Sequence, residues 1–202
     1  MPCRHKLTVS ALATIILSEL SPQGCKPVTE IAEKAFLRPI VVENALQTLA
    51  KATSAITIEE GVVCLHDPVE LAIAAVKNGA SETIVARSLD WKMFEDYTAK
   101  ALEEAGYTVY RSLRVPGKGG LEVDVLGLDP PAKLGIVVDC KHWNPRTATP
   151  SRLREAARQH RERLERLAKL WWKLRLPRGT WRLIPVIITL RENVPKLAEG
   201  VS

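Results

Sequence analysis

The chain has 202 residues, of which 46% are hydrophobic and 26% are charged, and its formal net charge is +6. This composition is typical of a globular protein, and it excludes a mainly disordered, collagen-like or low-complexity chain. The longest uncharged stretch with a helical pattern, residues 7–18, is too short to cross a bilayer, so no membrane segment is expected. Four cysteines without a C-x-x-C pair argue against a zinc ribbon, and such sparse usage is typical of a cytoplasmic protein.

The first part of the chain predicts three helices, a β-hairpin and a fourth helix. The helices are expected at about residues 7–20, 28–35, 39–52 and 68–77, and the hairpin strands at 55–58 and 62–65. Three helices followed by a hairpin resemble a winged-helix domain, whose third helix would recognise DNA and whose hairpin would form the wing. Residues 1–85, however, carry seven Lys or Arg against nine Asp or Glu. A protein-interaction or dimerisation module is therefore an equal alternative for this winged-helix-like domain, residues 1–79.

The second part, residues 80–202, predicts an α/β domain. A helix is expected at about residues 90–105, with Ser88 as its N-cap and Gly106 as its stop. Strands are expected at 107–115, 121–128, 134–141 and 181–190, a long basic helix at 151–173, and a short helix at 193–199. This order implies a mixed sheet covered by helices. Trp171 and Trp172 are adjacent, so one indole can be buried while the other is exposed.

Positive charge is concentrated in the second part. Between Lys141 and Arg182 the chain has thirteen Lys or Arg and three Asp or Glu, whereas the remainder has sixteen and twenty. A concentrated positive surface is what binding to a polyanion requires, because each neutralised phosphate releases counterions. The alternative is a solvated basic helix with acidic partners, but three acids cannot pair thirteen bases. The expected DNA contacts are Lys118, Arg146, Arg152, Arg154, Arg158, Gln159 and Arg161.

Three carboxylates and a lysine occupy positions that favour chemistry over packing. Glu95 lies at the edge of the apolar arc of its helix, beside Trp91. Asp124 alternates with Val123 and Val125 in its strand, and Asp139 and Lys141 share one face of an apolar strand, about 6.5 Å apart. One interpretation is an Asp–Lys ion pair at a strand end. The other is that two acids from adjacent strands offer oxygen ligands to Mg²⁺, with Lys141 beside the attacking water.

The ordered set of Glu95, Asp124 and Asp139-Cys140-Lys141 resembles the PD-(D/E)xK nuclease motif. Together with the segments 106–109 and 139–143, it is similar to the nuclease domain of Mrr-type restriction enzymes and related archaeal nucleases, over about residues 88–190. The resemblance implies a restriction-endonuclease-like core that hydrolyses DNA with Mg²⁺ or Mn²⁺. Asp124, Asp139 and Glu95 would hold the metal, and Lys141 would serve the attacking water. Two departures are Val123, where the family commonly has Pro, and Arg163, where some relatives have the Tyr of a Q-x-x-x-Y motif.

These observations together predict a two-domain cytoplasmic DNA endonuclease. One site per chain favours a homodimer if both strands are cut, and the first domain offers a surface for a protein partner. Two alternatives stay open. The chain could be a DNA-binding regulator or scaffold with an inactive nuclease-like domain, or a structure-specific nuclease for junctions, flaps or RNA.

Overall fold

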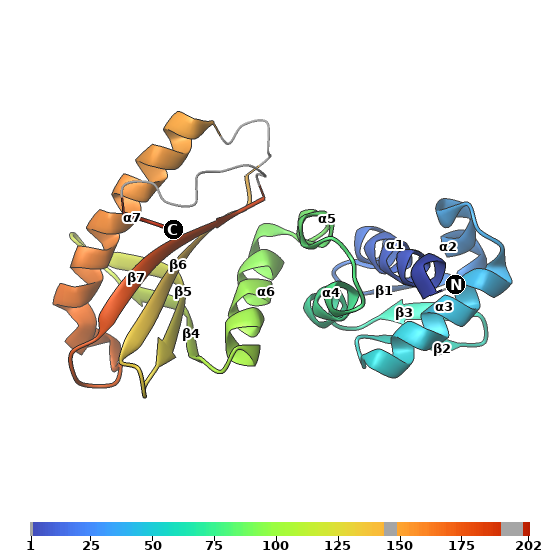
Figure 1. The fold of residues 1–202 in the computed structure, drawn as a ribbon, viewed down its shortest axis with the longest axis horizontal. Coiled ribbons are helices and arrows are strands. Elements are labelled where there is room, and N and C mark those ends of the chain that lie inside the picture. Colours follow the sequence, from blue (N-terminus) through green and yellow to red (C-terminus); the bar gives the residue numbers. More distant parts are fainter. Residues whose placement is uncertain (1, 144–148, 191–199) are drawn as a thin grey trace. The chain divides into compact units, whose positions relative to one another are not determined.

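The computed structural model describes residues 2–143, 149–190 and 200–202 (Figure 1). The chain divides into two compact units, Met1–Tyr97 and Thr98–Ser202. The helix predicted at 193–199 and the predicted DNA contact Arg146 lie outside the described residues. Each helix in the described part of the chain is too short or too polar to form a membrane span.

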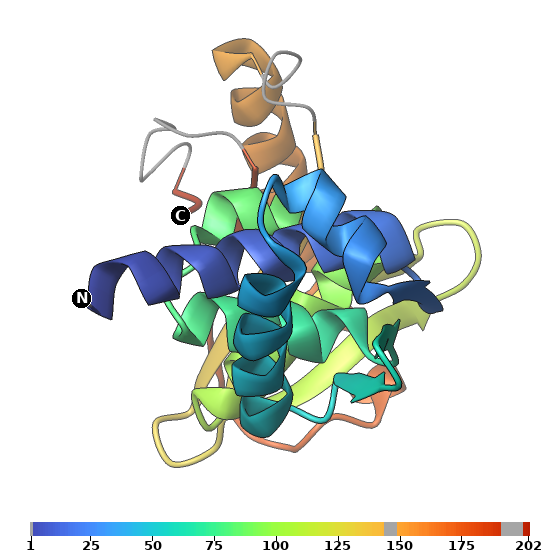
Figure 2. The ribbon, with the colours of Figure 1, turned by 90° about the vertical axis from the view of Figure 1, so that its right-hand side faces the viewer.

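The first unit combines helices with a small antiparallel sheet. Its elements are α1 (Pro2–Leu20), β1 (Gly24–Pro27), α2 (Val28–Ala35), α3 (Pro39–Ala52), β2 (Ile56–Glu59), β3 (Val62–Leu65), α4 (Pro68–Lys77) and α5 (Glu82–Arg87). The strand order is β1-β3-β2. Helix α1 packs against α3 and α4 around a core that includes Ile16, Leu46 and Leu71, and Figure 2 shows α1 crossing α3.

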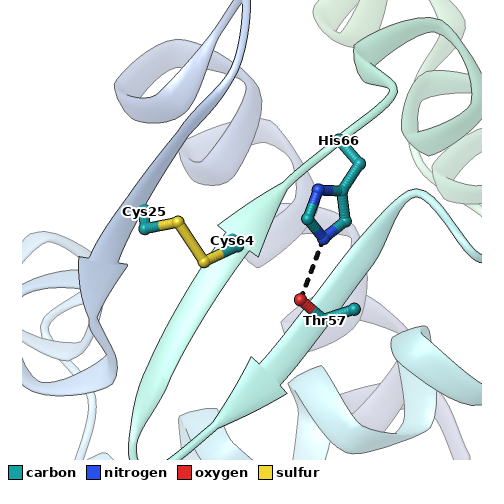
Figure 3. Close-up of a disulfide and its surroundings, with 4 residues drawn as sticks. All are labelled: Cys25, Thr57, Cys64 and His66. Carbon is teal, nitrogen blue, oxygen red and sulfur yellow. Dashed lines mark hydrogen bonds between the residues drawn. A yellow bond between two sulfur atoms is a disulfide. The ribbon is translucent and has the colours of Figure 1, made fainter.

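Two elements of this unit, β1 and α5, are missed by the sequence analysis. Strand β1 has only four residues, ends at Pro27 and lacks an apolar alternation, so its pairing with β3 is what defines it. In that pairing Cys25 lies opposite Cys64, and the two cysteines form a disulfide (Figure 3). By contrast, α2, α3, β3 and α4 have the predicted bounds.

The second unit is built on a mixed four-stranded sheet. Its strands are β4 (Thr108–Val115), β5 (Leu121–Asp129), β6 (Leu134–Lys141) and β7 (Arg182–Thr189), in the order β4-β5-β6-β7. Strands β4, β5 and β6 are antiparallel neighbours, and β7 runs parallel to β6. The predicted α/β class with a mixed sheet is confirmed.

Helices cover both faces of this sheet (Figure 1). The long helix α7 (Pro150–Leu170) continues into a 3₁₀ turn, η1 (Trp171–Leu174), and its Leu167 packs with Val137 and Leu126. On the other face, Ala99 of α6 (Trp91–Glu104) packs with Val125 and Val138. Thus β5 and β6 are the central strands, with apolar side chains on both sides.

The start of α6 differs from the prediction. Ser88 ends α5 instead of beginning α6, and Asp90 caps α6 because its Oδ1 accepts the N–H of Met93 at 2.7 Å. Trp91, predicted to be on the apolar arc, is 64% exposed, whereas Phe94 and Thr98 are buried.

Strand β5 does not keep the alternation predicted for it. Val123 packs in the same cluster as Leu126, although strict alternation would place them on opposite faces, and Val125 packs on the other face. The change falls at Asp124, whose cross-strand position on β4 is Ser112. Ser112 has a φ of 49°, which interrupts the regular strand there. The local irregularity therefore coincides with a predicted site residue.

Candidate active site

Two carboxylates lie where the β5–β6 ladder ends. Backbone pairing runs from Asp129 opposite Leu134 to Val125 opposite Val138, which makes Asp124 and Asp139 the next opposing positions. Just beyond the ladder, the Asp124 side chain accepts a backbone hydrogen bond, since its Oδ2 lies 2.7 Å from the N–H of Cys140. The end of regular pairing therefore brings a carboxylate from each strand to one place in the sheet.

Asp139 is the centre of a group of charged side chains. Its side chain is 3% exposed, and its Oδ1 accepts a hydrogen bond from Arg163 Nη1 at 2.6 Å. Lys141 Nζ lies 3.0 Å from Oδ1 and 2.8 Å from Oδ2, but only the contact with Oδ1 has hydrogen-bond geometry. One buried carboxylate thus faces two cations, and its Oδ2 keeps the capacity to accept a further ligand.

The two carboxyl groups have opposite pKa shifts. Burial raises the pKa of Asp124, the N–H of Cys140 opposes this shift, and the neighbouring charge of Asp139 adds to it. Burial also favours protonated Asp139, but the hydrogen bond from Lys141 and the charge of Arg163 outweigh it and hold the pKa of Asp139 below its usual value. Within the described part of the chain Asp124 forms no ion pair, and a divalent cation would supply the charge that both carboxylates can share.

The donor set fits a hard divalent cation. Asp124 and Asp139 provide carboxylate oxygens, which are the ligands that Mg²⁺ prefers, and Oδ2 of Asp139 is a buried oxygen that accepts no hydrogen bond from the residues that the structure describes. Among the described residues, no three His, Cys, Asp or Glu side chains are grouped to hold a metal ion. The site therefore offers two protein carboxylates, and Mg²⁺ commonly keeps several waters beside one or two such ligands.

Glu95 and the predicted DNA contacts are distributed over both units. Glu95 is half-buried on α6 in the first unit, so its role as a metal ligand stays a prediction. Lys118 is exposed in the loop between β4 and β5. The remaining described contacts are exposed on α7: Arg152, Arg154, Arg158, Gln159 and Arg161.

The predicted DNA contacts on α7 differ in the protein side chains that they already contact. Arg158 Nη2 lies 2.8 Å from Glu155, and Gln159 donates to the same carboxylate at 2.7 Å. The guanidinium of Arg152 lies 4.3 Å from the centre of the Trp143 ring, and Lys141 Nζ lies 5.8 Å from the same ring. Trp143 therefore links the basic helix to the carboxylate site.

Arg163 is a site residue that the sequence analysis left without a role. A helical pattern could have identified it, because Ala156, His160, Arg163 and Leu167 follow the spacing of one helix face, and the other three are buried. A cation on a buried face requires an anionic partner, and Asp139 is that partner. The residue that departs from the Q-x-x-x-Y pattern thus contacts a predicted metal ligand.

His160 is a core residue of α7. Its ring is fully buried, and Nε2 lies 2.9 Å from the carbonyl oxygen of Val137. A carbonyl oxygen can only accept, so Nε2 carries the proton. Burial lowers the pKa of His160, with the Val137 contact acting in the opposite direction, and the ring is neutral at pH 7.

One comparison with known proteins, the match to a family model, points to the same part of the chain. Residues 86–166 match the family described as restriction endonuclease. No curated protein matches the chain. The crystal structure of protein VC1899 from Vibrio cholerae matches with 15% sequence identity, and the match covers 94% of this chain and 42% of that one. Its TM-score of 0.33 is too low to support an argument about fold or function. The family match covers less than half of the chain, and it supports a nuclease domain of restriction endonuclease type at residues 86–166.

Proposed function

We propose that residues 80–202 form a PD-(D/E)xK domain that hydrolyses phosphodiester bonds in DNA as a metal-dependent endonuclease. The observation that carries this proposal is the opposition of Asp124 and Asp139 at the end of the β5–β6 ladder, with Lys141 Nζ 2.8 Å from Asp139. The similarity of residues 86–166 to restriction endonucleases supports the same class of reaction.

Each site residue has a role in this reaction. Asp124 and Asp139 would hold Mg²⁺ or Mn²⁺, and Glu95 would complete the ligand set. When bound, the ion supplies positive charge to the phosphodiester and lowers the pKa of a water. Lys141, held by Asp139, orients the attacking water and stabilises charge on the phosphate. Lys118, Arg152, Arg154 and Arg161 bind the DNA backbone, and Arg158 and Gln159 contribute after release from Glu155.

An inactive scaffold is a less economical explanation of the buried charges. Asp139 is 3% exposed and is held by two cations, and apolar side chains of similar volume often stabilise a core at least as well as such a group. A domain that only carries a binding surface gains nothing from keeping the group. A domain that binds a metal ion at Asp139 needs this buried carboxylate.

Cleavage of supercoiled plasmid tests the proposal. We expect nicking or linearisation with Mg²⁺ or Mn²⁺ and none with EDTA, and a rate at least about 100-fold lower in Asp139→Asn and Asp124→Asn. Asp124→Asn can still accept the Cys140 N–H, so it should fold. Asp129→Asn removes an acid from the opposite end of β5 and is the matched control, which should cleave normally. Equal cleavage by all variants would refute the site, and DNA binding without cleavage would support the scaffold.

We propose that the winged-helix-like domain, residues 1–79, pairs with a second copy of the chain. The turn before α3 and the first turn of α3 expose Phe36, Leu37, Ile40 and Val41, and Phe36 is 95% exposed. A helix that reads base edges presents mainly polar side chains, whereas exposed apolar clusters mark protein interfaces. A dimer would also provide one site for each DNA strand. Sedimentation velocity should give a dimer that Phe36→Ser with Ile40→Ser dissociates, and a monomeric wild type would refute the pairing.

We propose that the protein is cytoplasmic. The Cys25–Cys64 disulfide then favours an organism whose cytoplasmic proteins keep disulfides. Intracellular disulfides are common in hyperthermophiles and rare in mesophiles. The low Asn and Gln content and the abundant Arg are also typical of proteins from heat-loving organisms. Labelling of free thiols in freshly lysed cells would test whether Cys25 and Cys64 are paired there.

A further inference from the structure

A second basic surface lies at the opposite end of β6 from the carboxylates. Its six cations are Lys133, Lys169, Lys173, Arg175, Arg178 and Arg182, and its aromatic member is Trp172. All seven side chains are exposed. We call this set the basic–tryptophan surface. Lys133 precedes Asp139 by six residues, so the surface is about 20 Å from the carboxylates along an extended strand.

Specific contacts hold this surface together. The carbonyl oxygen of Pro177 accepts from Trp171 Nε1 at 3.0 Å and from Trp181 Nε1 at 3.1 Å, which closes the segment after α7 into a loop. Lys133 Nζ lies 5.0 Å from the centre of the Trp181 ring, and the Lys133 carbonyl accepts the Arg182 N–H at 2.9 Å. The turn before β6, the loop after α7 and the start of β7 therefore meet at one place.

Trp172 is held at the surface by this arrangement. Its neighbour Trp171 packs against the core and stacks at 6.0 Å on Trp181, whereas Trp172 is 75% exposed. Lys173 Nζ lies 5.3 Å from the centre of the Trp172 ring. An exposed indole beside cations combines a stacking face with phosphate-binding charges.

Helix stabilisation does not explain these charges. Lys169 lies in the last turn of α7 and Lys173 in the 3₁₀ turn after it, where both interact favourably with the helix dipole, but Lys133, Arg178 and Arg182 lie on other segments. None of the six cations forms an ion pair with a residue in the described part of the chain. The nearest acids along the chain are Glu165, one turn before Lys169, and Asp129 at the end of β5.

We propose that the basic–tryptophan surface binds a single-stranded segment of DNA, with a base stacked on Trp172 and phosphates bound by the cations. An unpaired base presents its face to an aromatic side chain, whereas the base faces inside a duplex are covered. The inference rests on the proposed nuclease, and it specifies the substrate class as DNA with a single-stranded arm. The separation of about 20 Å corresponds to about six base steps between the arm and the cleaved bond.

Fluorescence anisotropy with labelled (dT)₁₆ and a 16-base-pair duplex tests the proposal. The 202-residue chain carries Asp139→Asn in this assay to prevent cleavage. We expect Trp172→Ala to raise the Kd for (dT)₁₆ by about 5-fold or more and to leave the Kd for the duplex nearly unchanged. Trp172→Phe, which keeps an aromatic face, should bind (dT)₁₆ with a Kd close to that of the parent. The triple variant Lys173→Ala, Arg175→Ala and Arg178→Ala should reduce the slope of log K against log salt by about 2. The matched control, Lys51→Ala, Lys77→Ala and Lys92→Ala, removes the same charge and should leave the slope unchanged.

Each result separates this inference from the proposed nuclease. Equal (dT)₁₆ binding by Trp172→Ala, Trp172→Phe and the parent would refute the inference, as would preferred binding of the duplex. A loss of affinity in Trp172→Ala that is equal for (dT)₁₆ and for the duplex would also refute the inference. Plasmid cleavage by Trp172→Ala in the otherwise wild-type chain measures the nuclease alone. If no cleavage occurs but (dT)₁₆ binding depends on Trp172, the single-strand site stands without the nuclease.

Discussion

The ion pair between Arg163 and Asp139 gives a prediction with a definite magnitude. Arg163→Ala removes a guanidinium that lies 2.6 Å from a carboxylate with a 3% exposed side chain. Removing one partner of a fully buried pair costs about 3–5 kcal/mol. Arg163 itself is 23% exposed, and Lys141 keeps its contact with Asp139. We therefore expect the free energy of unfolding to fall by about 1.5–3 kcal/mol at pH 7.

The pH dependence of this loss has a defined direction. Despite burial, Lys141 and Arg163 hold the pKa of Asp139 below its usual value. A carboxyl group with a lowered pKa contributes stability above its unfolded pKa of about 3.9, and that stability is lost as the pH falls through the folded pKa. The difference between wild type and Arg163→Ala should therefore be complete at neutral pH and shrink in acid.

Urea unfolding in metal-free buffer, followed by tryptophan fluorescence, measures both effects. Trp171 and Trp181 stack in the second unit and report its unfolding. Arg158→Ala is the matched control on α7, because Arg158 pairs with Glu155 at the solvent-exposed surface and its loss should lower stability clearly less than the loss of Arg163. Equal stability of the two variants at neutral pH would refute the reasoning. A difference from wild type that stays constant into acid would contradict the assignment to Asp139.

Three further predictions concern the packing of each unit. Because burial lowers the pKa of His160, its contribution to stability is present above about pH 6.5 and is lost as the pH falls. The melting temperature should therefore drop less between pH 7.5 and 5 in His160→Gln than in the wild type. Cys25→Ser with Cys64→Ser opens a crosslink between cysteines 39 residues apart, and urea unfolding should show a loss of about 4 kcal/mol in the first unit. In Gly135→Ala the new Cβ would lie 2.5 Å from Leu183, so calorimetry should show a loss of about 1–3 kcal/mol, and an unchanged melting temperature would contradict the close packing of β6 on β7.

Sequence patterns predicted the regular elements well because local signals define them. Apolar spacing together with Pro39 at its start predicted α3, and the periodicity of β6 predicted both its bounds and the shared face of Asp139 and Lys141. The missed element β1 has no such signal, because it exists through long-range pairing and the Cys25–Cys64 bond. Arg163 was missed for a similar reason, since its role depends on a partner 24 residues away on another element.

The break in β5 explains why the carboxylate site could be predicted only in part. A regular strand would place Asp124 by alternation, but the face changes there, opposite Ser112, and no local pattern indicates it. The same break ends backbone pairing between β5 and β6, so the acceptor of the Cys140 N–H comes from outside the β5–β6 backbone ladder. Asp124 supplies that acceptor, so one carboxylate both satisfies the backbone and faces Asp139. A regular ladder would satisfy this N–H with a carbonyl group, and the residues that conflict with the strand pattern are therefore those from which the site is built.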